Sequence, residues 1–570
     1  MKYKLVNQNY RSEYVKNLLE ERGVADFSHF IHPSFTDINN PQIFSSSNLA
    51  AKIVLSSLNK NILIIVDSDC DGYTSGAIMY NYLKQLKPDI KLDYILHERK
   101  QHGLIDLIDK ILESETQYDL IIQPDSGTND YVYQAQMPET QFLILDHHDL
   151  DESTELIDNV TIVNSQLEPY PNKELTGAGV TWQFCRLLDQ YTENNYSKML
   201  IDLAALGIIG DMASVLEQEN RAIIKFGLDN INNPFFKALV EKRKFSIKDN
   251  YTPTTMAFYV VPLINGMIRA GEQEDKDLMF QAFIDGERLV VSHKRGANGE
   301  LVELATEAAR VCTNAKSRQD RILTKITEEI EAKIFKYDLL ENQILFIKLD
   351  EEDFPAELNG LVATRLAAKY KRPTMIGRLN DEGFDRGSIR GINDSELKDF
   401  KQYLLDTGFF EYVQGHANAA GYSLPDKYLK DLHEKANEDL SQIDFGDKYY
   451  EVNFQRMAMD SDIGAIISDI DKYSTLFGQH NPEPLICITN INISKKDIQI
   501  MGKNADTVKI MKNGIAYMKF KANDFIEDLQ GYDTISLNVV GRANMNYWGG
   551  QITPQIFIDG YEVNNGALAF

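Results

Sequence analysis

The spacing of apolar residues changes three times along the chain. Between about residues 50 and 230, runs of Ile, Leu and Val alternate with amphipathic stretches, which is typical of parallel strands joined by helices in a doubly wound sheet. The predicted strands are 62–67, 92–96, 119–125, 142–148 and 160–164, and the helices between them include 74–86 and 103–113. Because ligands of such sheets bind at the carboxyl ends of the strands, the residues that end these runs are the first candidates for chemistry.

Two further patterns follow this segment. Residues 300–337 are charged and helical, and the isoleucines from Ile322 to Ile334 recur every four residues, which predicts a long connecting helix with one apolar stripe. A second α/β alternation begins at about 343. After about 450, short strand-like segments separated by turn residues predict a small barrel, an OB-fold. These segments are 485–493, 507–513, 515–522, 534–543 and 555–563.

The fold class expected from these patterns is a multidomain α/β protein with a C-terminal OB-fold β-barrel. The chain has 570 residues, which is too long for one hydrophobic core. The predicted parts are an N-terminal lead at 1–50, an α/β catalytic domain at 51–230, a helical connector at 231–340, a second α/β domain at 341–440 and the OB-fold-like domain at 441–570.

The composition is ordinary for a globular protein, with 43% hydrophobic and 25% charged residues. No apolar run approaches the roughly 20 residues that span a bilayer, and the first residues lack the apolar core of a signal peptide, so no membrane association is expected. The four cysteines lie far apart without a CxxC pair, which argues against a disulfide framework or a zinc site. A reducing cytoplasm is therefore the expected location.

The formal net charge of −26 argues, taken alone, against a nucleic-acid-binding protein, which usually carries a basic surface. A narrow channel for one strand needs only a local track of Lys and Arg with aromatic stacking. The segments 369–373 and 509–521 offer such basic residues, and Trp548 offers a stacking surface unless it is buried in the barrel.

Four acidic or histidine-bearing spots follow apolar runs: "DSDCDG" at 67, "PDSG" at 124, "LDHHDLD" at 145 and "GDMASV" at 210. The first has strand-like alternation, so its carboxylates are expected to point the same way and to repel one another without a cation. The groups offered are Asp67, Asp69, Asp71, Asp125, Asp146, His147, His148 and Asp211. Carboxylates with imidazoles suit Mn²⁺ or Mg²⁺, and two ions about 3.5–4 Å apart would use this many ligands in displacement at phosphorus.

Each spot also has an ordinary structural interpretation. Asp and Gly are common in surface turns, so the first spot alone is compatible with a turn. Asp211 alone is compatible with a helix cap, and His147 and His148 alone with surface histidines. The shared position after apolar runs of one α/β segment favours a joint site over these separate explanations.

The four motifs in this order resemble the DHH phosphoesterase family and, within it, the RecJ single-strand exonucleases. "DSDCDGYTSG", "PDSG", "DHH" and "GDM" are similar to its four motifs. The resemblance covers nearly the whole chain and identifies 51–230 as the DHH domain and 341–440 as the DHH-associated domain. The other segments that carry it are 18–35, 175–188, 219–228, 262–272, 357–373, 386–391, 415–424, 474–484 and 541–562.

The resemblance implies roles for individual residues. Metal ligands would be Asp67, Asp69, Asp125, Asp146, His147 and Asp211, while Asp71 would be either a ligand or a support for one. His148 would contact the phosphate or support a metal ligand, and with His147 and His416 it completes the expected catalytic histidines. Ser388 and Arg390 match residues that hold a terminal 5′-phosphate, a group suited to a planar guanidinium. Gly415 and Asn418 flank His416 in a glycine-rich motif that lets the backbone approach the strand.

One segment departs from the family pattern. The family has a proline-containing, Arg-bearing stretch after the second strand, whereas this chain reads "ILHERKQHGLI" at 95–105, without proline and with shorter spacing. Arg99, Lys100 and His102 are the candidates for the phosphate contact there.

The expected function is a metal-dependent exonuclease that degrades single-stranded DNA from 5′ to 3′ and releases 5′-mononucleotides, in DNA repair, recombination or replication. We expect a monomer that meets single-stranded DNA, a helicase and a single-strand-binding protein. Two alternatives remain open at this point. One is a DHH phosphodiesterase for short oligonucleotides or cyclic dinucleotides, or a pyrophosphatase; the other is an inactive scaffold. The length of the chain argues against the first, and its complete set of metal carboxylates against the second.

Overall fold

The computed structural model describes residues 1–151, 154–155, 157–248, 250–297, 299–349, 354–393, 395–445, 449–502, 504–529, 534–548 and 550–564. The chain forms two compact units. The N-terminal unit comprises Arg22–Gln319 with Ser474–Pro482, and the C-terminal unit comprises Met1–Glu21, Asp320–Tyr473 and Glu483–Phe570. No helix in the described ranges combines the length and the apolar character needed to cross a membrane.

A five-stranded parallel sheet forms the centre of the N-terminal unit, with strand order β3-β2-β4-β5-β6. Its strands are β2 (Ile62–Val66), β3 (Leu92–Leu96), β4 (Leu120–Pro124), β5 (Gln141–Asp146) and β6 (Val160–Asn164). All five lie where the runs of apolar residues predicted them. These runs are continuous rather than alternating because both faces of the sheet are covered.

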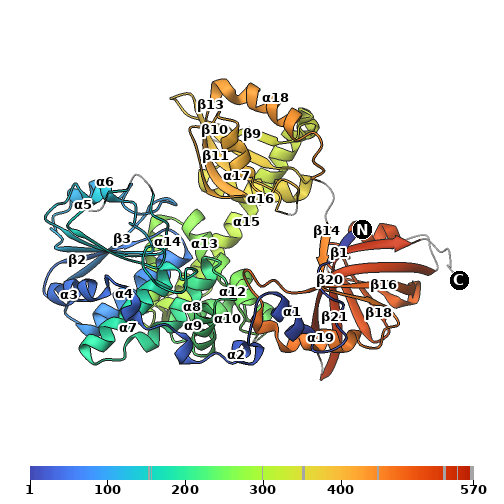
Figure 1. Ribbon diagram of the computed structural model, residues 1–570, viewed down its shortest axis with the longest axis horizontal. Helices are drawn as coiled ribbons and strands as arrows, with labels where there is room; N and C mark the ends of the chain where they lie inside the picture. Colours follow the sequence, from blue (N-terminus) through green and yellow to red (C-terminus); the bar gives the residue numbers. More distant parts are fainter. Residues whose placement is uncertain are drawn as a thin grey trace. The chain divides into compact units, whose positions relative to one another are not determined.

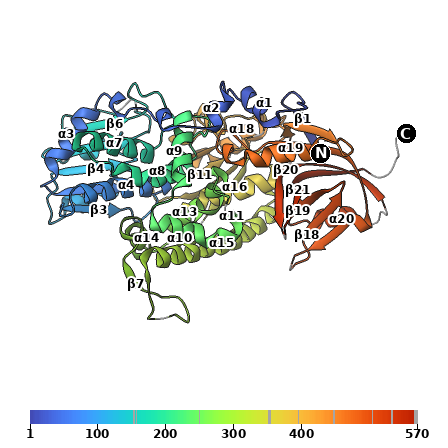
Figure 2. The ribbon, with the colours of Figure 1, turned by 90° about the horizontal axis from the view of Figure 1, so that it is seen from below.

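Helices cover the two faces of this sheet unequally (Figures 1 and 2). Ile62, Ile64 and Val66 of β2 point into the larger core, which includes side chains of α3 (Ser47–Ser57), α4 (Cys70–Leu86), α7 (Gly177–Thr192) and α8 (Ile201–Gly210). Leu63 and Ile65 point to the smaller core under α5 (Ile108–Leu112) and α6 (Tyr131–Gln134). The predicted helix at 103–113 is therefore shorter than expected, because residues 103–107 form turns.

Further helices complete the N-terminal unit. They are α2 (Phe27–Ile31), α9 (Gln218–Asp229), α10 (Pro234–Lys242), α11 (Lys244–Ile247), α12 (Pro253–Tyr259), α13 (Val261–Ala270) and α14 (Gln273–Asp285). A hairpin of β7 (Leu289–Val291) and β8 (Leu301–Glu303) projects beyond them (Figure 2).

The predicted connecting helix is α15 (Leu304–Lys336), a single helix of 33 residues that runs from one unit into the other. Ile326, Ile330 and Ile334 are buried as the four-residue repeat predicted. Ile322 is only partly buried, and Leu323 takes the buried place, because a four-residue repeat drifts around a helix of 3.6 residues per turn.

The second α/β pattern forms a mixed sheet in the order β12-β13-β11-β10-β9. Its strands are β9 (Leu345–Leu349), β10 (Thr374–Leu379), β11 (Phe384–Arg390), β12 (Tyr412–His416) and β13 (Ala419–Pro425), with helices α16 (Asn359–Tyr370), α17 (Phe400–Asp406) and α18 (Leu429–Asp439). Side chains of α15, β9 and α16 form one core, and side chains of α17 and α18 with residues of β11 to β13 form a second.

The C-terminal β-region contains the five predicted strands and two more. The sheet order is β15-β16-β20-β21-β19-β18-β17, with α1 (Tyr14–Glu21), α19 (Ile463–Lys472) and α20 (Asn523–Leu529) also in this unit. The strands are β15 (Phe454–Met457), β16 (Leu485–Ser494), β17 (Ile498–Met501), β18 (Thr507–Lys512), β19 (Ile515–Lys519), β20 (Thr534–Trp548) and β21 (Gln551–Asn564).

The first residues of the chain belong to this C-terminal unit. Strand β1 (Lys2–Leu5) pairs in parallel with β14 (Tyr449–Val452), so two segments more than 440 residues apart in the sequence lie side by side. Residues 1–21 and 22–50 therefore fall in different units, a division that the local pattern of the lead did not reveal.

Candidate metal centre

The first acidic motif joins a strand to a helix. Asp67 lies directly after β2 and is fully buried, whereas Asp69 caps the N-terminus of α4 by accepting a hydrogen bond from the Gly72 amide at 3.0 Å. Strand alternation therefore ends at Asp67, and the expectation that all three aspartates share strand spacing is wrong. A Cβ on Gly72 would lie 2.5 Å from the Asp67 carbonyl oxygen, so glycine allows this tight junction.

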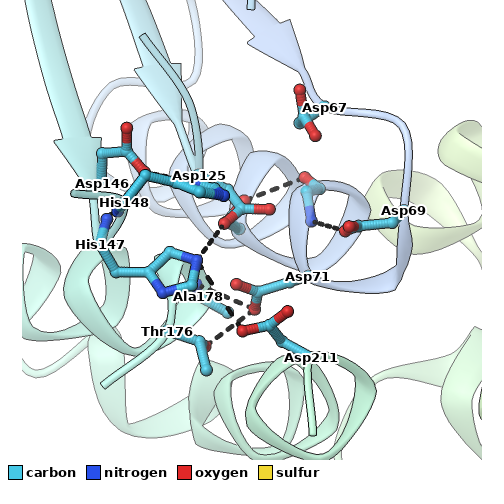
Figure 3. A network of polar contacts seen from close by, with 12 residues as sticks. Asp67, Asp69, Asp71, Asp125, Asp146, His147, His148, Thr176, Ala178 and Asp211 are labelled. Carbon is cyan, nitrogen blue, oxygen red and sulfur yellow. Dashed lines mark hydrogen bonds and ion pairs between the residues drawn. The ribbon is translucent and has the colours of Figure 1, made fainter. Parts of the chain in front are cut away.

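Asp71, in the first turn of α4, uses its two oxygens differently. Oδ1 accepts hydrogen bonds from Thr176 Oγ1 at 2.9 Å and from the Ala178 amide at 3.1 Å, at the start of α7 (Figure 3). Oδ2 is buried and has no hydrogen-bond partner among the described residues. Burial raises the pKa of Asp71, and the nearby His147 opposes this rise. The carboxylate is thus fixed in place by one oxygen while the other stays available for a ligand.

Asp125 lies directly after β4 with a left-handed backbone, φ 68°, and its amide donates to the Leu145 carbonyl at 2.9 Å. Such a φ is uncommon outside glycine and is typical of functional sites. Oδ1 lies 3.2 Å from His147 Nε2, without a hydrogen bond of good geometry. Burial together with the charges of Asp71 and Asp69 raises the pKa of Asp125 well above its usual range. A cation would remove this conflict between buried carboxylates.

Asp146, the last residue of β5, is held by hydrogen bonds from its neighbours. Oδ1 lies 2.8 Å from His148 Nδ1 and accepts from the His147 amide at 2.7 Å, and Oδ2 accepts from the Thr128 amide at 3.1 Å. Burial alone would raise the pKa of Asp146, but His148 and these donors hold it well below its usual range. In return, the Asp146 charge raises the pKa of His148 to about 10.

His147 and Asp211 close the other side of the cluster (Figure 3). His147 Nε2 lies 3.8 Å from Asp211 Oδ2, and burial lowers the pKa of His147, which favours the neutral imidazole that binds metals. Asp211 follows the last residue of α8 and so caps the C-terminal rather than the N-terminal end of a helix. Burial, with the charges of Asp71 and Asp69, raises its pKa to about 8.

Two histidines from the segment 95–105, which differs from the family pattern, also lie beside this cluster. His102 Nδ1 lies 2.5 Å from Asp67 Oδ2, so the residue expected to bind substrate lies against the first of the candidate metal carboxylates. His97, which the sequence analysis did not select, is buried with Nε2 3.9 Å from Asp67 Oδ1. It could have been found from the sequence, because it directly follows the apolar run of β3 just as Asp67 follows that of β2. Arg99 is exposed.

The arrangement fits divalent cations bound by oxygen and nitrogen. Among the described residues there are three sets of side chains, and within each set the ligand atoms lie within 4.8 Å of one another. They are Asp67, Asp69 and His102; Asp71, His147 and Asp211; and Asp125, Asp146, His147 and His148. Asp71 Oδ2 and Asp125 Oδ1 are buried and have no hydrogen-bond partner in the part of the chain that the structure describes, which is rare for carboxylate oxygens unless a bound ion satisfies them.

The candidate phosphate residues lie in the C-terminal unit. Ser388 and Arg390 are two residues apart on β11 and so share one face of its sheet. Arg390 donates from Nε to Thr364 Oγ1 at 3.1 Å and from Nη1 to the Ile389 carbonyl at 2.7 Å, which orients the guanidinium.

A pocket of about 550 Å³ in this unit is lined by Arg390, His416 and Asn418, among others, but not by Ser388. Gly415 has φ 128°, and its carbonyl accepts from Lys401 Nζ at 3.1 Å. The side chain of Trp548 lies outside the described residues.

Comparisons with known proteins agree with this fold. Residues 61–208 match the model of the DHH family, N-terminal domain, which contains the first three acidic motifs. Residues 464–560 match the RecJ OB domain. The N-terminal unit thus contains a DHH domain, the class of protein that the parallel sheet and its strand-end carboxylates define.

Similar full-length proteins narrow this class. A relative named as an SPbeta prophage-derived single-strand DNA-specific exonuclease of Bacillus subtilis is 34% identical over 99% of this chain and 98% of its own length. The single-stranded-DNA-specific exonuclease RecJ of the same organism is 27% identical over 99% of this chain and 70% of its own. The crystal structure of Thermus thermophilus RecJ with Mn²⁺ has the same fold, with a TM-score of 0.69, 18% identity and coverage of 92% and 72% of the two chains. The chain belongs to the RecJ single-strand exonuclease branch of the DHH family.

Proposed function

We propose that the chain is a metal-dependent exonuclease that hydrolyses single-stranded DNA from the 5′ end and releases 5′-mononucleotides. The observation that carries this proposal is the cluster of carboxylates and imidazoles at the ends of β2, β4 and β5, in which two buried carboxylate oxygens lack hydrogen-bond partners among the described residues. The names of its full-length relatives supply the substrate class. The family fold with Mn²⁺ or Mg²⁺ bound in the Thermus thermophilus protein supports the choice of cofactor.

Two Mn²⁺ or Mg²⁺ ions would be held by Asp67, Asp69, Asp71, Asp125, Asp146, His147 and Asp211. When bound, such ions lower the pKa of a shared water and offset charge on the scissile phosphate. Asp71 would serve in both senses left open by the sequence: Oδ1 is held by Thr176 at the start of α7, and Oδ2, which has no hydrogen-bond partner among the described residues, would be the metal ligand.

The other residues of the centre position the reaction. Asp146 accepts from three groups on its own loop and so orients His147 and His148 together. His148 is half-exposed while Asp146 holds its Nδ1, so its outer edge faces solvent, where it can donate to a phosphate oxygen of the strand.

The C-terminal unit would hold the strand and its end. Arg390, oriented by Thr364, is the proposed contact for a 5′-phosphate, with Ser388 beside it on β11. Gly415, His416 and Asn418 would contact the strand. Arg99 remains a second candidate for a phosphate contact, and Trp548 for base stacking.

The five-part division of the chain, with limits near 50, 230, 340 and 440, is retained as a proposal. So are a monomeric state, a place in DNA repair, recombination or replication, and encounters with a helicase and a single-strand-binding protein. The four cysteines are free and buried, which supports a cytoplasmic location.

The test is digestion of single-stranded DNA and RNA labelled at either end, with Mn²⁺ or Mg²⁺ in turn. We expect mononucleotides from the 5′ end of DNA and no cleavage by Asp146→Ala. The control Asp89→Asn should cleave normally, because Asp89 is an exposed carboxylate in the turn that follows α4. Shortening from the 3′ end, or cleavage confined to dinucleotides, would refute the proposal. Wild-type activity in Asp146→Ala would remove the metal centre from the mechanism.

A further inference from the structure

The segment between β3 and α5 places two imidazoles against the first metal carboxylate. His102 Nδ1 approaches Asp67 Oδ2 to 2.5 Å, and His97 Nε2 lies 3.9 Å from Asp67 Oδ1. Neither histidine belongs to the four acidic motifs, and both lie in the stretch at 95–105 that departs from the family pattern. Asp67 therefore has an imidazole nitrogen near each of its oxygens.

His97 is arranged like a metal-binding histidine. Its side chain is completely buried, Nδ1 lies 2.6 Å from Asp106 Oδ1, and Nε2 has no hydrogen-bond partner among the described residues. A carboxylate that accepts from Nδ1–H leaves the lone pair on Nε2 facing Asp67 Oδ1 in the neutral ring. Two electron-rich atoms facing each other in a buried place indicate a cation beside them, and a carboxylate behind the imidazole is typical of metal ligands.

His102 is held in position by its own loop. The Gly103 amide donates to Asp67 Oδ1 at 3.1 Å, and the Leu104 amide donates to Asp130 Oδ2 at 2.9 Å. Gly103 has φ 68°, and a Cβ there would lie 2.3 Å from the Asp130 carboxylate, so the turn requires glycine. This turn places the imidazole of His102 against the Asp67 carboxylate and leaves part of the ring exposed to solvent.

We propose that Asp67, Asp69 and His102 bind one divalent cation together, with His97 as a buried nitrogen donor beside Asp67. The ligand atoms of the first three residues lie within 4.8 Å of one another. Imidazole ligands suit Mn²⁺ better than Mg²⁺, which prefers oxygen, so the site selects Mn²⁺. The inference rests on the proposed function and adds nitrogen ligands to its metal centre.

The experiment measures metal binding directly, without DNA. Mn²⁺ is titrated into metal-free protein by calorimetry, and the nitrogen modulation of the Mn²⁺ electron spin echo counts coordinated imidazoles. His102→Ala should weaken one Mn²⁺ site about tenfold or more and remove one nitrogen signal, while Mg²⁺ binding changes less. The matched control is His29→Ala, because His29 is equally exposed and pairs with Asp37 at 2.8 Å, so it also loses a histidine–carboxylate contact.

A second variant covers the buried histidine. Asp106→Asn keeps the shape of the side chain but weakens its hold on His97 Nδ1, and it should reduce Mn²⁺ affinity with the fold intact by circular dichroism. Unchanged Mn²⁺ affinity and nitrogen count in His102→Ala would overturn the inference. If DNA binding were weaker in that variant at the same time, His102 would be a substrate-binding residue and not a metal ligand. If wild-type protein bound no Mn²⁺ at all, the proposed function itself would fail, so the two failures are distinguishable.

Discussion

Asp125→Asn should stabilise the metal-free protein while abolishing its activity. Asp125 is buried, its Oδ1 lacks a hydrogen-bond partner within the described ranges, and its pKa is raised well above the usual range by burial and by Asp71 and Asp69. Asn removes the charge, tolerates the left-handed backbone, and its amide could donate to His147 Nε2, which lies 3.2 Å from the position of Oδ1. Relieving one unsatisfied buried group is worth about 1–3 kcal/mol.

The dependence of this effect on pH follows from the direction of the shift. Because the folded pKa of Asp125 is higher than the unfolded value of about 3.9, wild-type protein loses stability relative to the variant as the pH rises above about 4. Below that pH the carboxyl is protonated in both states and the advantage of Asn disappears. At pH 7 to 8, 1–3 kcal/mol corresponds to a rise of about 2–6 °C in the Tm of a unit of this size.

The assay follows the N-terminal unit alone. Trp182 is buried in α7 and donates to the Ser197 carbonyl at 2.8 Å, so its fluorescence in a Trp548→Phe background reports the melting of that unit. Adding Mn²⁺ at a hundred times its Kd should stabilise wild type by about 2.7 kcal/mol and Asp125→Asn much less, which reverses the order of stability. Asp89→Asn should shift neither. A variant less stable than wild type in chelator, or one that gains the full Mn²⁺ shift, would refute this account of Asp125.

Two other substitutions test the positioning of the site and of the strand end. Gly177→Ala should lower kcat about a hundredfold, because its Cβ would lie 2.3 Å from Asp125 Oδ1. The control Gly464→Ala should be neutral, because no described atom lies within 4 Å of its Cβ. Equal rates in the two variants would contradict the close approach of Gly177 to Asp125. Arg390→Ala should reduce the preference for 5′-phosphorylated over 5′-hydroxyl strands about tenfold or more without changing Mn²⁺ affinity. Arg386→Ala is the control variant for the loss of an arginine from the same strand. An unchanged preference in Arg390→Ala would place end recognition elsewhere.

The periodicity of the chain predicted the elements of the N-terminal unit closely. All five strands of the parallel sheet were expected from their apolar runs, because a strand covered on both faces must be apolar along its whole length. The chemistry was expected at the ends of these runs for a similar reason: parallel strands end at one edge, so Asp67, Asp125 and Asp146 had to lie near one another. The long helix α15 was expected from its repeat of isoleucines.

Other features depended on contacts that no local pattern contains. Only one of the two Asp71 oxygens accepts hydrogen bonds from the described residues, because the start of α7, more than 100 residues later in the chain, supplies the Thr176 and Ala178 donors to Oδ1. The pairing of β1 with β14 joins the first residues of the chain to its C-terminal unit, because an edge strand takes whichever partner the fold brings beside it.

The metal centre shows the same boundary between sequence and structure. The sequence by itself determined which carboxylates and histidines end the strands, because burial and strand direction are written in the local pattern of apolar residues. Only the tertiary structure decided that His97 and His102 meet Asp67, since a turn of Gly103 against Asp130 sets the direction of that loop. Local sequence specifies the element, whereas the direction of a side chain beyond it depends on the distant groups that satisfy its hydrogen bonds and charge.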